Sequence, residues 1–242
     1  MEHVLEISGL KKSFGKREIL KGLNLELKRA ENIAILGGSG TGKSVFIKSI
    51  VGLVIPDSGS IKVLGKKLDN LEYEELNNLR LKVGYLFQGG ALYDSMSVKQ
   101  NLEFPVRRSN ISKNKKEIEE MIEQVLESVG LNEAKNKMPA ELSGGMKKRI
   151  ALARTLILKP EIILYDEPTT GLDPVTSGEI SELMLKIQEE YNASSITVTH
   201  DIKCVKMTAD RIKLIRDGIF SAAGTYDELT QSDDKYVREF LN

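Results

Sequence analysis

The stretch GGSGTGKS, from Gly37 to Ser44, constrains this chain most, because it follows directly on the apolar run from Ile33 to Leu36. Glycines let successive backbone N–H groups point inward around phosphate oxygens, and the positive end of a following helix adds to that attraction. The spacing G-x-x-x-x-G-K-S between a strand and a helix is typical of a loop that holds a nucleotide triphosphate. An ordinary glycine-rich turn is the alternative, and the complete motif in this context disfavours it.

Within this loop, Lys43 is expected to reach the β- and γ-phosphates, and the Ser44 hydroxyl is expected to coordinate magnesium. The backbone of the surrounding glycines is expected to enclose the phosphate oxygens. The predicted ATP-binding residues of this segment are Gly37, Gly38, Ser39, Gly40, Thr41, Gly42, Lys43, Ser44 and Val45.

A second chemical element is EIILYDEP, in which an apolar run precedes Asp166 and Glu167. A buried strand that ends in two carboxylates delivers them to the sheet edge where parallel α/β folds bind ligands. Asp166 is predicted to hold the magnesium shell. Glu167 is predicted to polarise the attacking water as general base, a role that contributes roughly 10²- to 10⁴-fold in rate. Taken alone, an acidic pair in a solvated loop is the alternative.

The third element is ELSGGMKKRIALARTL, in which Ser143, Gly144 and Gly145 precede a long helix. The start of a helix attracts anions through its free N–H groups and its dipole, so this segment is a second candidate for phosphate contact. A plain N-cap at Ser143 followed by a flexible turn explains the segment equally well when it stands alone.

Strands and helices alternate at both ends of the chain, with a helical stretch between them. Strands are predicted over VLEIS, LNLEL and IAIL, a helix through VFIKSIVGL, then strands EIILYDEP and SSITVTH and a hairpin arm RIKLIRDG, with a helix after Asp173. Apolar residues at three- and four-residue steps predict a helix over Lys115–Val129 that Gly130 ends. The segment from Ser109 to Lys116 is the most linker-like.

Composition excludes several classes of protein. The chain has 242 residues, 40% hydrophobic and 29% charged, which predicts a globular protein with a soluble surface. Lys plus Arg and Asp plus Glu both number 35, so no overall field attracts nucleic acid or anionic lipid. The single Cys204 excludes an internal disulfide and, with an N-terminus unlike a signal peptide, predicts a cytosolic protein. No apolar segment approaches the roughly 18 residues that cross a bilayer, so a membrane connection is expected through a partner chain.

The order of six motifs resembles that of the ATP-binding cassette (ABC) family over essentially the whole chain. GGSGTGKS, LFQ, LSGGM, IILYDE, GLD and VTH follow one another, and LSGG shortly before the aspartate strand is a feature that other phosphate-loop proteins lack. The resemblance implies an α/β P-loop NTPase cassette with a RecA-like core, an N-terminal antiparallel β subdomain and an inserted helical subdomain. It implies one domain over 1–242, with the nucleotide-binding core at 1–88 and 161–242 and the helical subdomain, which carries the signature, at 89–160.

The same resemblance implies the roles of further residues. Phe14 is similar to the aromatic that stacks on adenine, with a core aromatic as the alternative. Gln88 is similar to the residue that links the magnesium site to the membrane partner, and His200 to the switch histidine at the γ-phosphate. The implied catalytic residues are Glu167, His200 and Gln88, and the implied metal ligands are Ser44, Gln88 and Asp166. The implied cofactors are ATP and Mg²⁺.

In this family two cassettes face head to tail, so each ATP lies between GGSGTGKS of one chain and LSGGM of the other. Ser143, Gly144 and Gly145 are therefore expected to act in trans in a homodimer, with Asp173 reaching the second subunit. The signature has Met146 where many relatives have glutamine. Because the anion contacts come chiefly from Ser143 and glycine backbone groups, binding is expected to survive that change.

The segment from Val83 to Arg108 lies where the family's cassettes receive a helix of the transmembrane subunit. Its LFQ, small-residue pair and ALY, together with LSGGM, resemble the Mla-type ATPases that work with MCE-domain proteins in lipid transport. This resemblance implies an ATP hydrolase that powers phospholipid transport from the cytoplasmic side of the bacterial inner membrane, peripheral to a permease. A polar-solute importer of the amino-acid type is the alternative. A soluble ABC protein that binds nucleic acid is disfavoured, because there is no coiled-coil insertion and no second cassette.

Within that segment, Leu92, Tyr93 and Met96 are candidate apolar anchors for the partner helix, beside the small residues Gly89, Gly90 and Ala91. The alternative is that the three larger side chains pack the helical stretch onto its own core.

Overall fold

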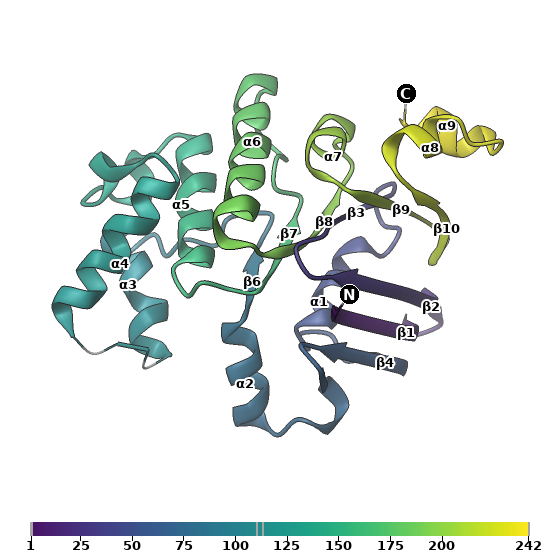
Figure 1. The fold of residues 1–242 in the computed structure, drawn as a ribbon, viewed down its shortest axis with the longest axis horizontal. Coiled ribbons are helices and arrows are strands. Elements are labelled where there is room, and N and C mark those ends of the chain that lie inside the picture. The colour runs from purple at the N-terminus through teal and green to yellow at the C-terminus, as the bar shows by residue number, and fades with distance from the viewer. Residues whose placement is uncertain (1, 110, 113, 242) are drawn as a thin grey trace.

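The computed structural model describes residues 2–109, 111–112 and 114–241, and its centre is a six-stranded sheet with strand order β10-β9-β3-β8-β7-β6 (Figure 1). Five strands run parallel, and β10 pairs antiparallel with β9. The bounds are β3 (Asn32–Leu36), β6 (Val83–Leu86), β7 (Ile162–Asp166), β8 (Ser194–Thr199), β9 (Arg211–Arg216) and β10 (Ile219–Gly224).

Every residue of β3, β7 and β8 is buried, as expected for parallel strands that are covered on both faces. The side chains of β7 divide between two hydrophobic clusters. Ile163 and Tyr165 join the cluster on one face, and Ile162 and Leu164 join the cluster on the other. Because parallel strands end at one edge of the sheet, the loops that follow β3, β7 and β8 begin side by side.

A second, antiparallel sheet has the order β2-β1-β4-β5. Its two longest strands extend beyond the predicted VLEIS and LNLEL and meet in a hairpin, where Phe14 pairs with Arg17 around Gly15. Gly15 has φ +59, a left-handed conformation that glycine adopts without strain. The strands are β1 (His3–Phe14), β2 (Arg17–Lys28), β4 (Ser58–Val63) and β5 (Lys66–Lys67).

Helices cover the central sheet, and in the described part of the chain three short 3₁₀ helices lie in the connections. Helix α1 buries Phe46, Ile47 and Ile50 between the two sheets, in the cluster that contains the inner faces of β1 and β2. The helices are α1 (Lys43–Ile50), α2 (Tyr73–Leu81), α3 (Val98–Arg108), α4 (Lys115–Ser128), α5 (Gly144–Leu156), α6 (Pro174–Tyr191), α7 (Ile202–Thr208), α8 (Tyr226–Thr230) and α9 (Lys235–Leu241), with 3₁₀ helices at Leu68–Asn70, Asn132–Ala134 and Pro139–Glu141.

Helices α3, α4 and α5 form the teal part at the left of Figure 1. The helix predicted over Lys115–Val129 is confirmed, and it ends at Ser128 before Gly130, whose φ is +68. The apolar side chains of α3, α4 and α5 share one core with β7 and α6. Helix α5 packs against β6 and α6, and α3 and α4 pack against α5. The division of the chain at residues 89 and 160 stays a prediction. Two residues of the predicted linker, Asn110 and Lys113, lie outside the described residues.

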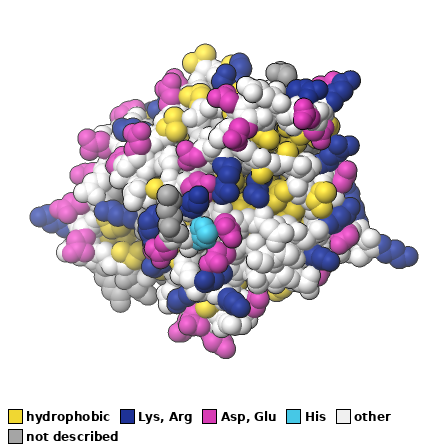
Figure 2. All heavy atoms as spheres, turned by 45° about the vertical axis from the view of Figure 1, so that its right-hand side comes forward, with side chains coloured by type: hydrophobic (Ala, Val, Ile, Leu, Met, Phe, Trp, Pro, Cys, Tyr) yellow, Lys and Arg dark blue, Asp and Glu magenta, His cyan; other side chains and the backbone are white. Residues whose placement is uncertain are grey.

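The C-terminal helices α8 and α9 bury Leu229, Val237 and Leu241 against β3 and β9. Cys204 is buried, and its burial raises the pKa of the thiol. Within residues 2–109, 111–112 and 114–241, no helix is both long and apolar enough to cross a membrane. Figure 2 shows acidic and basic side chains interspersed over one face, with small hydrophobic patches between them.

Candidate nucleotide site

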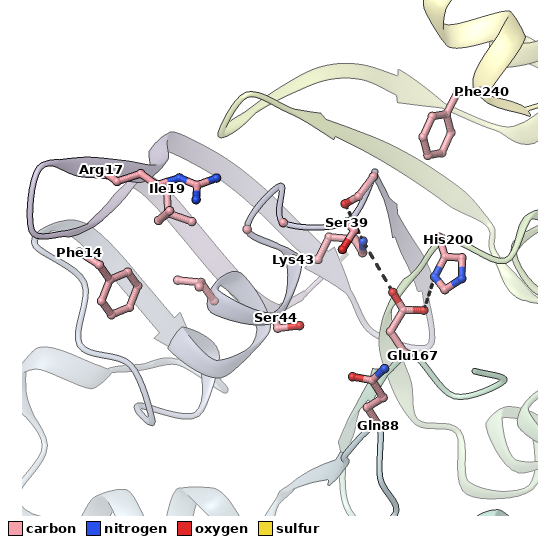
Figure 3. Close-up of a pocket in the computed structure, with 14 residues that line it drawn as sticks. Phe14, Arg17, Ile19, Ser39, Lys43, Ser44, Gln88, Glu167, His200 and Phe240 are labelled. Atoms are coloured by element: carbon pink, nitrogen blue, oxygen red, sulfur yellow. Dashed lines mark hydrogen bonds and ion pairs between the residues drawn. The ribbon is translucent and has the colours of Figure 1, made fainter. Parts of the chain in front are cut away.

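A cleft of about 760 Å³ lies at the carboxyl edge of the central sheet, where the loops after β3, β7 and β8 meet (Figure 3). Its lining includes most of the predicted glycine loop and residues from five other segments. The lining residues are Phe14, Arg17, Ile19, Gly38, Ser39, Gly40, Gly42, Lys43, Ser44, Val45, Gln88, Glu167, His200 and Phe240. The cleft is large enough for a nucleotide-sized ligand.

The glycine loop joins β3 to α1, and close packing requires two of its glycines. A Cβ on Gly37 would lie 2.6 Å from the Ile215 side chain, and a Cβ on Gly42 would lie 2.9 Å from Leu20. Gly42 also has φ +104 as the residue that precedes α1. The free N–H groups at the start of α1 therefore lie at the cleft, in the arrangement that favours a bound phosphate.

Two predicted loop residues, Gly37 and Thr41, do not line the cleft. They support its shape instead, because Lys43 Nζ donates to the Gly37 carbonyl at 2.7 Å and Thr41 Oγ1 donates to the Gly38 carbonyl at 2.9 Å. The Lys43 ammonium also lies 3.6 Å from Glu167 Oε1. A single cation thus connects the glycine loop to the carboxylate that follows β7.

Asp166 is the last residue of β7, and its carboxylate accepts two side-chain hydrogen bonds. Ser44 Oγ donates to Oδ1 at 3.3 Å, and Tyr85 OH donates to Oδ2 at 2.9 Å. The sequence predicted the proximity of Ser44 and Asp166 but gave no signal for Tyr85, which belongs to the neighbouring strand β6.

Glu167 is buried, and several polar groups hold its carboxylate. Oε2 accepts hydrogen bonds from Thr170 Oγ1 at 3.1 Å and Thr199 Oγ1 at 3.2 Å, and it lies 2.9 Å from His200 Nδ1. The Glu167 backbone has φ +50, an uncommon conformation for a residue with a side chain, and its N–H donates to the Val198 carbonyl at 2.9 Å. The turn after β7 is therefore fixed at both its backbone and its carboxylate.

The two ends of the cleft differ in character. At one end Phe14 is 53% exposed, with Lys12 Nζ 5.4 Å from the centroid of its ring, so the alternative of a core aromatic is wrong. At the other end the His200 side chain is 62% exposed. Phe240 on α9 also lines this region, which the sequence did not predict (Figure 3).

The predicted signature lies outside this cleft. Ser143 is the N-cap of α5, and its Oγ accepts a hydrogen bond from the Met146 N–H at 3.2 Å, while the Met146 side chain packs on the helical core. Gly144 lines a second hollow, of about 370 Å³, that it shares with Gln88. A Cβ on Gly145 would lie only 2.6 Å from Thr176 Cγ2, so glycine lets α5 approach the start of α6.

Asp173 also lies outside the cleft, as the exposed N-cap of α6. Its Oδ1 accepts hydrogen bonds from the N–H groups of Val175 and Thr176, and its Oδ2 accepts one from Thr176 Oγ1 at 2.6 Å. These hydrogen bonds, chiefly those from Thr176, lower the pKa of the carboxyl. The local function of Asp173 is therefore helix capping, and its predicted contact with a second subunit stays a prediction.

A third hollow, of about 630 Å³, runs along β6 between α2, α3 and α5. Tyr93 lines it, is 44% exposed and packs edge-on against Phe104 at a centroid distance of 5.2 Å. Arg154 lies over the Tyr93 ring and donates to the Ala91 carbonyl at 2.5 Å. Leu92 packs on the helical core, so the core-packing alternative is right for that residue.

The family of this chain follows from its similarity to known proteins. A family model described as ABC transporter matches residues 20–170. The chain belongs to the ABC transporter family. This ABC cassette is therefore an ATP-hydrolysing domain.

Two curated relatives of this cassette carry different names. It is 40% identical over 238 residues to the "Probable ribonucleotide transport ATP-binding protein mkl" of Mycobacterium leprae, covering 98% of this chain and 68% of that protein. It is 39% identical over 241 residues to the "Intermembrane phospholipid transport system ATP-binding protein MlaF" of Haemophilus influenzae, covering 99% of this chain and 90% of that protein. The cassette thus spans about two thirds of the mycobacterial protein and most of the other.

A solved relative supports the predicted fold and a dimer. The cassette MJ0796, in a dimeric post-hydrolysis state bound to ADP and Pi, matches with a TM-score of 0.83 and 31% identity over 91% of this chain and 98% of that one. The predicted α/β ABC cassette fold, with its antiparallel sheet and helical elements, is confirmed. Dimeric cassettes of this kind support a homodimer for the present chain.

Proposed function

We propose that this cassette powers phospholipid transport through a separate permease that works with an MCE-domain partner. The observation that carries the proposal is the similarity to MlaF, because it extends over 99% of this chain and 90% of that protein. The resemblance of the segment from Val83 to Arg108 to the Mla-type ATPases adds to it. On this proposal the cassette is bound to the permease at the cytoplasmic side of the bacterial inner membrane.

In the proposed ATP site, Glu167 acts as general base for the attacking water. Its Oε1 faces Lys43 and its Oε2 faces His200, so the carboxylate lies between the cation expected at the γ-phosphate and the histidine expected to sense it. A base held in one orientation needs little rearrangement before it accepts a proton. His200 and Gln88 are the proposed partners of Glu167 in hydrolysis, and both line the same cleft.

The donor set beside the glycine loop fits Mg²⁺. Ser44 Oγ and Asp166 Oδ1 are oxygen ligands 3.3 Å apart, and Mg²⁺ commonly takes one or two protein oxygens together with substrate phosphates. We assign these two residues and Gln88 as its ligands. When bound, the ion neutralises charge that develops on the transferred phosphoryl group.

The adenine is proposed to stack on Phe14, because an aromatic residue left 53% exposed at the mouth of the cleft offers a flat apolar surface. The triphosphate then extends along the loop from Gly38 to Val45 toward Glu167. In Figure 3 this is the direction from Phe14 to His200. Phe14 thereby fixes the base, and the loop fixes the phosphates.

A second copy of the chain is proposed to complete each site. The exposed start of α5, where free N–H groups attract an anion, consists of Ser143, Gly144 and Gly145. These three residues do not line the cleft of their own chain. Head-to-tail pairing would bring this helix start, with Asp173, to the partner's ATP. The dimeric MJ0796 cassette supports such pairing.

The hollow along β6 is the proposed permease-docking groove. It combines the exposed aromatic rings of Tyr73, Tyr93 and Phe104, a grouping that is costly to leave in water. It also adjoins the segment that carries Gln88, so a docked helix would contact the same loop that reaches the ATP site.

The proposal is tested by purifying the cassette with its membrane partners from detergent-solubilised membranes and identifying those partners. The complex is then reconstituted into vesicles with labelled phospholipid, with the Glu167→Gln complex as the matched inactive control. ATP-dependent lipid transfer by the wild type alone supports the proposal. Uptake of a polar solute without lipid movement would favour the alternative, an importer of the amino-acid type.

A nucleic-acid function is tested separately on the purified dimer. The balanced charge of the chain predicts no salt-sensitive binding to DNA or RNA. Binding that weakens steeply with salt would instead support the soluble class of ABC protein.

A further inference from the structure

Lys148 connects three segments that act in the proposed ATPase. It lies on α5, shortly after the signature residues that begin this helix. Its side-chain ammonium donates to the Gln88 carbonyl at 2.5 Å and to the Glu167 carbonyl at 3.3 Å. One side chain thus joins the signature helix, the segment after β6 and the turn after β7.

The environment of Lys148 is unusual for a lysine. The residue is only 7% exposed, and the other buried residues of α5 are all apolar. Burial lowers the pKa of the ammonium, while the charges of Asp166 and Glu167 oppose that change. A buried ammonium is costly unless hydrogen bonds compensate it, and a similar apolar side chain would pack at no such cost. The two carbonyl contacts are therefore the specific contribution of this lysine.

Both carbonyls belong to residues whose position matters for hydrolysis. Glu167 has φ +50, a backbone conformation that few residues with a side chain adopt, and this conformation sets the direction of its carbonyl group. The side chain of Gln88 lines the nucleotide cleft, while its carbonyl is held from behind by Lys148. A shift of about 1 Å in a reacting group costs on the order of 10²-fold in rate, so a fixed backbone at these two points has catalytic consequences.

We propose that Lys148 is a positioning residue for ATP hydrolysis: it holds the backbone of Gln88 and Glu167 in register with the signature helix. When the first turn of α5 contacts ATP bound to a partner chain, a displacement of α5 then moves Gln88 and Glu167 in the ATP site of its own chain. The proposal rests on the assignment of Glu167 as general base.

The test compares Lys148→Met, which keeps length and apolar volume but removes the donors, with Lys148→Arg, which keeps donors for both carbonyls. Lys147→Met, at the exposed neighbouring position, is the matched control. We expect Lys148→Met to lower kcat by roughly 10- to 100-fold. Its ATP Kd and its Tm should stay at wild-type values, because neither phosphate contacts nor packing are removed. Lys148→Arg should recover most of the lost kcat, and Lys147→Met should match wild type.

Wild-type kcat in Lys148→Met would overturn the proposal. A loss of kcat with a parallel loss of ATP affinity or Tm would also overturn it, because a general structural defect would then explain the result. An inactive Lys148→Arg that folds and binds ATP normally would contradict the hydrogen-bonding role.

Glu167→Gln separates this inference from the proposed function. If Glu167→Gln hydrolyses ATP at the wild-type rate, the assignment of the general base fails, whatever Lys148→Met does. If Glu167→Gln is inactive, adding Lys148→Met should produce little further loss, because both changes act on the same step. Full additivity of the two losses would show that Lys148 acts elsewhere.

Discussion

The phenol hydroxyl of Tyr85 donates a 2.9 Å hydrogen bond to Oδ2 of Asp166, across the pairing of β6 with β7. Burial, together with the Asp166 charge, raises the pKa of Tyr85, so the phenol remains a protonated donor at neutral pH. The bond fixes the rotation of the carboxylate and directs Oδ1 toward Ser44. A residue outside every motif thus orients a predicted metal ligand.

Replacing Tyr85 with Phe should raise the Mg²⁺ concentration needed for half-maximal ATPase activity by roughly tenfold, the range seen when an outer partner of a metal ligand is removed. Magnesium titration of the steady-state rate measures the change, with Tyr73→Phe at an exposed site as the control. An unchanged magnesium requirement would show that Asp166 needs no such orientation.

Replacing Lys43 with Ala should abolish ATP binding or turnover, because the β- and γ-phosphates lose their side-chain cation. The change also frees the Gly37 carbonyl, so a weakened loop is expected to add to the loss. Nucleotide binding by calorimetry measures it, and Lys48→Ala on the same helix serves as the control. Normal turnover in Lys43→Ala would refute the assigned site.

Replacing Glu167 with Gln should leave ATP binding intact and slow hydrolysis by roughly 10²- to 10⁴-fold, because the amide keeps the shape but cannot accept the proton. The bound state should accumulate as a dimer. Light scattering after gel filtration with ATP and magnesium measures the mass, and a persistent monomer, even with the permease present, would argue against a shared site.

The two signature glycines should respond differently to alanine. A Cβ at Gly145 would lie 2.6 Å from Thr176 Cγ2, whereas a Cβ at Gly144 would make an ordinary 3.6 Å contact with Leu172. Gly145→Ala should therefore lower the free energy of unfolding by about 1–3 kcal/mol, the usual cost of overpacking. Adding Thr176→Ser, which removes the clashing methyl, should restore it. Denaturant titration measures the free energy of unfolding of each variant. A Gly145→Ala single variant as stable as the wild type would contradict the packing argument.

Replacing Tyr93 with Glu should abolish stimulation of the ATPase by the co-purified permease while nucleotide binding stays intact, since a charge at the docking groove would be desolvated on binding. Ile219→Glu, an exposed apolar position on β10, provides the control. Permease-stimulated and basal rates are compared in the same vesicles. If the permease stimulates the ATPase of Tyr93→Glu as strongly as that of the wild type, the hollow along β6 is not the docking site.

Local sequence signals predicted those parts of the site that depend on one segment. The glycine loop and the Asp166–Glu167 pair follow from the physics of a strand end and a helix start. Tyr85 and Lys148 could not be predicted in this way, because their contacts depend on the register between β6 and β7 and on the packing of α5. The strands predicted over VLEIS and LNLEL are shorter than β1 and β2 for a similar reason. Pairing between β1 and β2 extends both strands over residues with little intrinsic strand preference.

The position of β3 in the sheet determines when this protein can fold during its synthesis. Ala34 pairs with Thr197 on one side and with Ile212 on the other, so a ribosome must translate most of the message before either edge of β3 is covered. Helices α3 to α5 are contiguous in the chain and can compact earlier, through local contacts. A nascent chain that stops before β9 therefore presents an apolar strand with an open edge, which can pair with the strands of other chains.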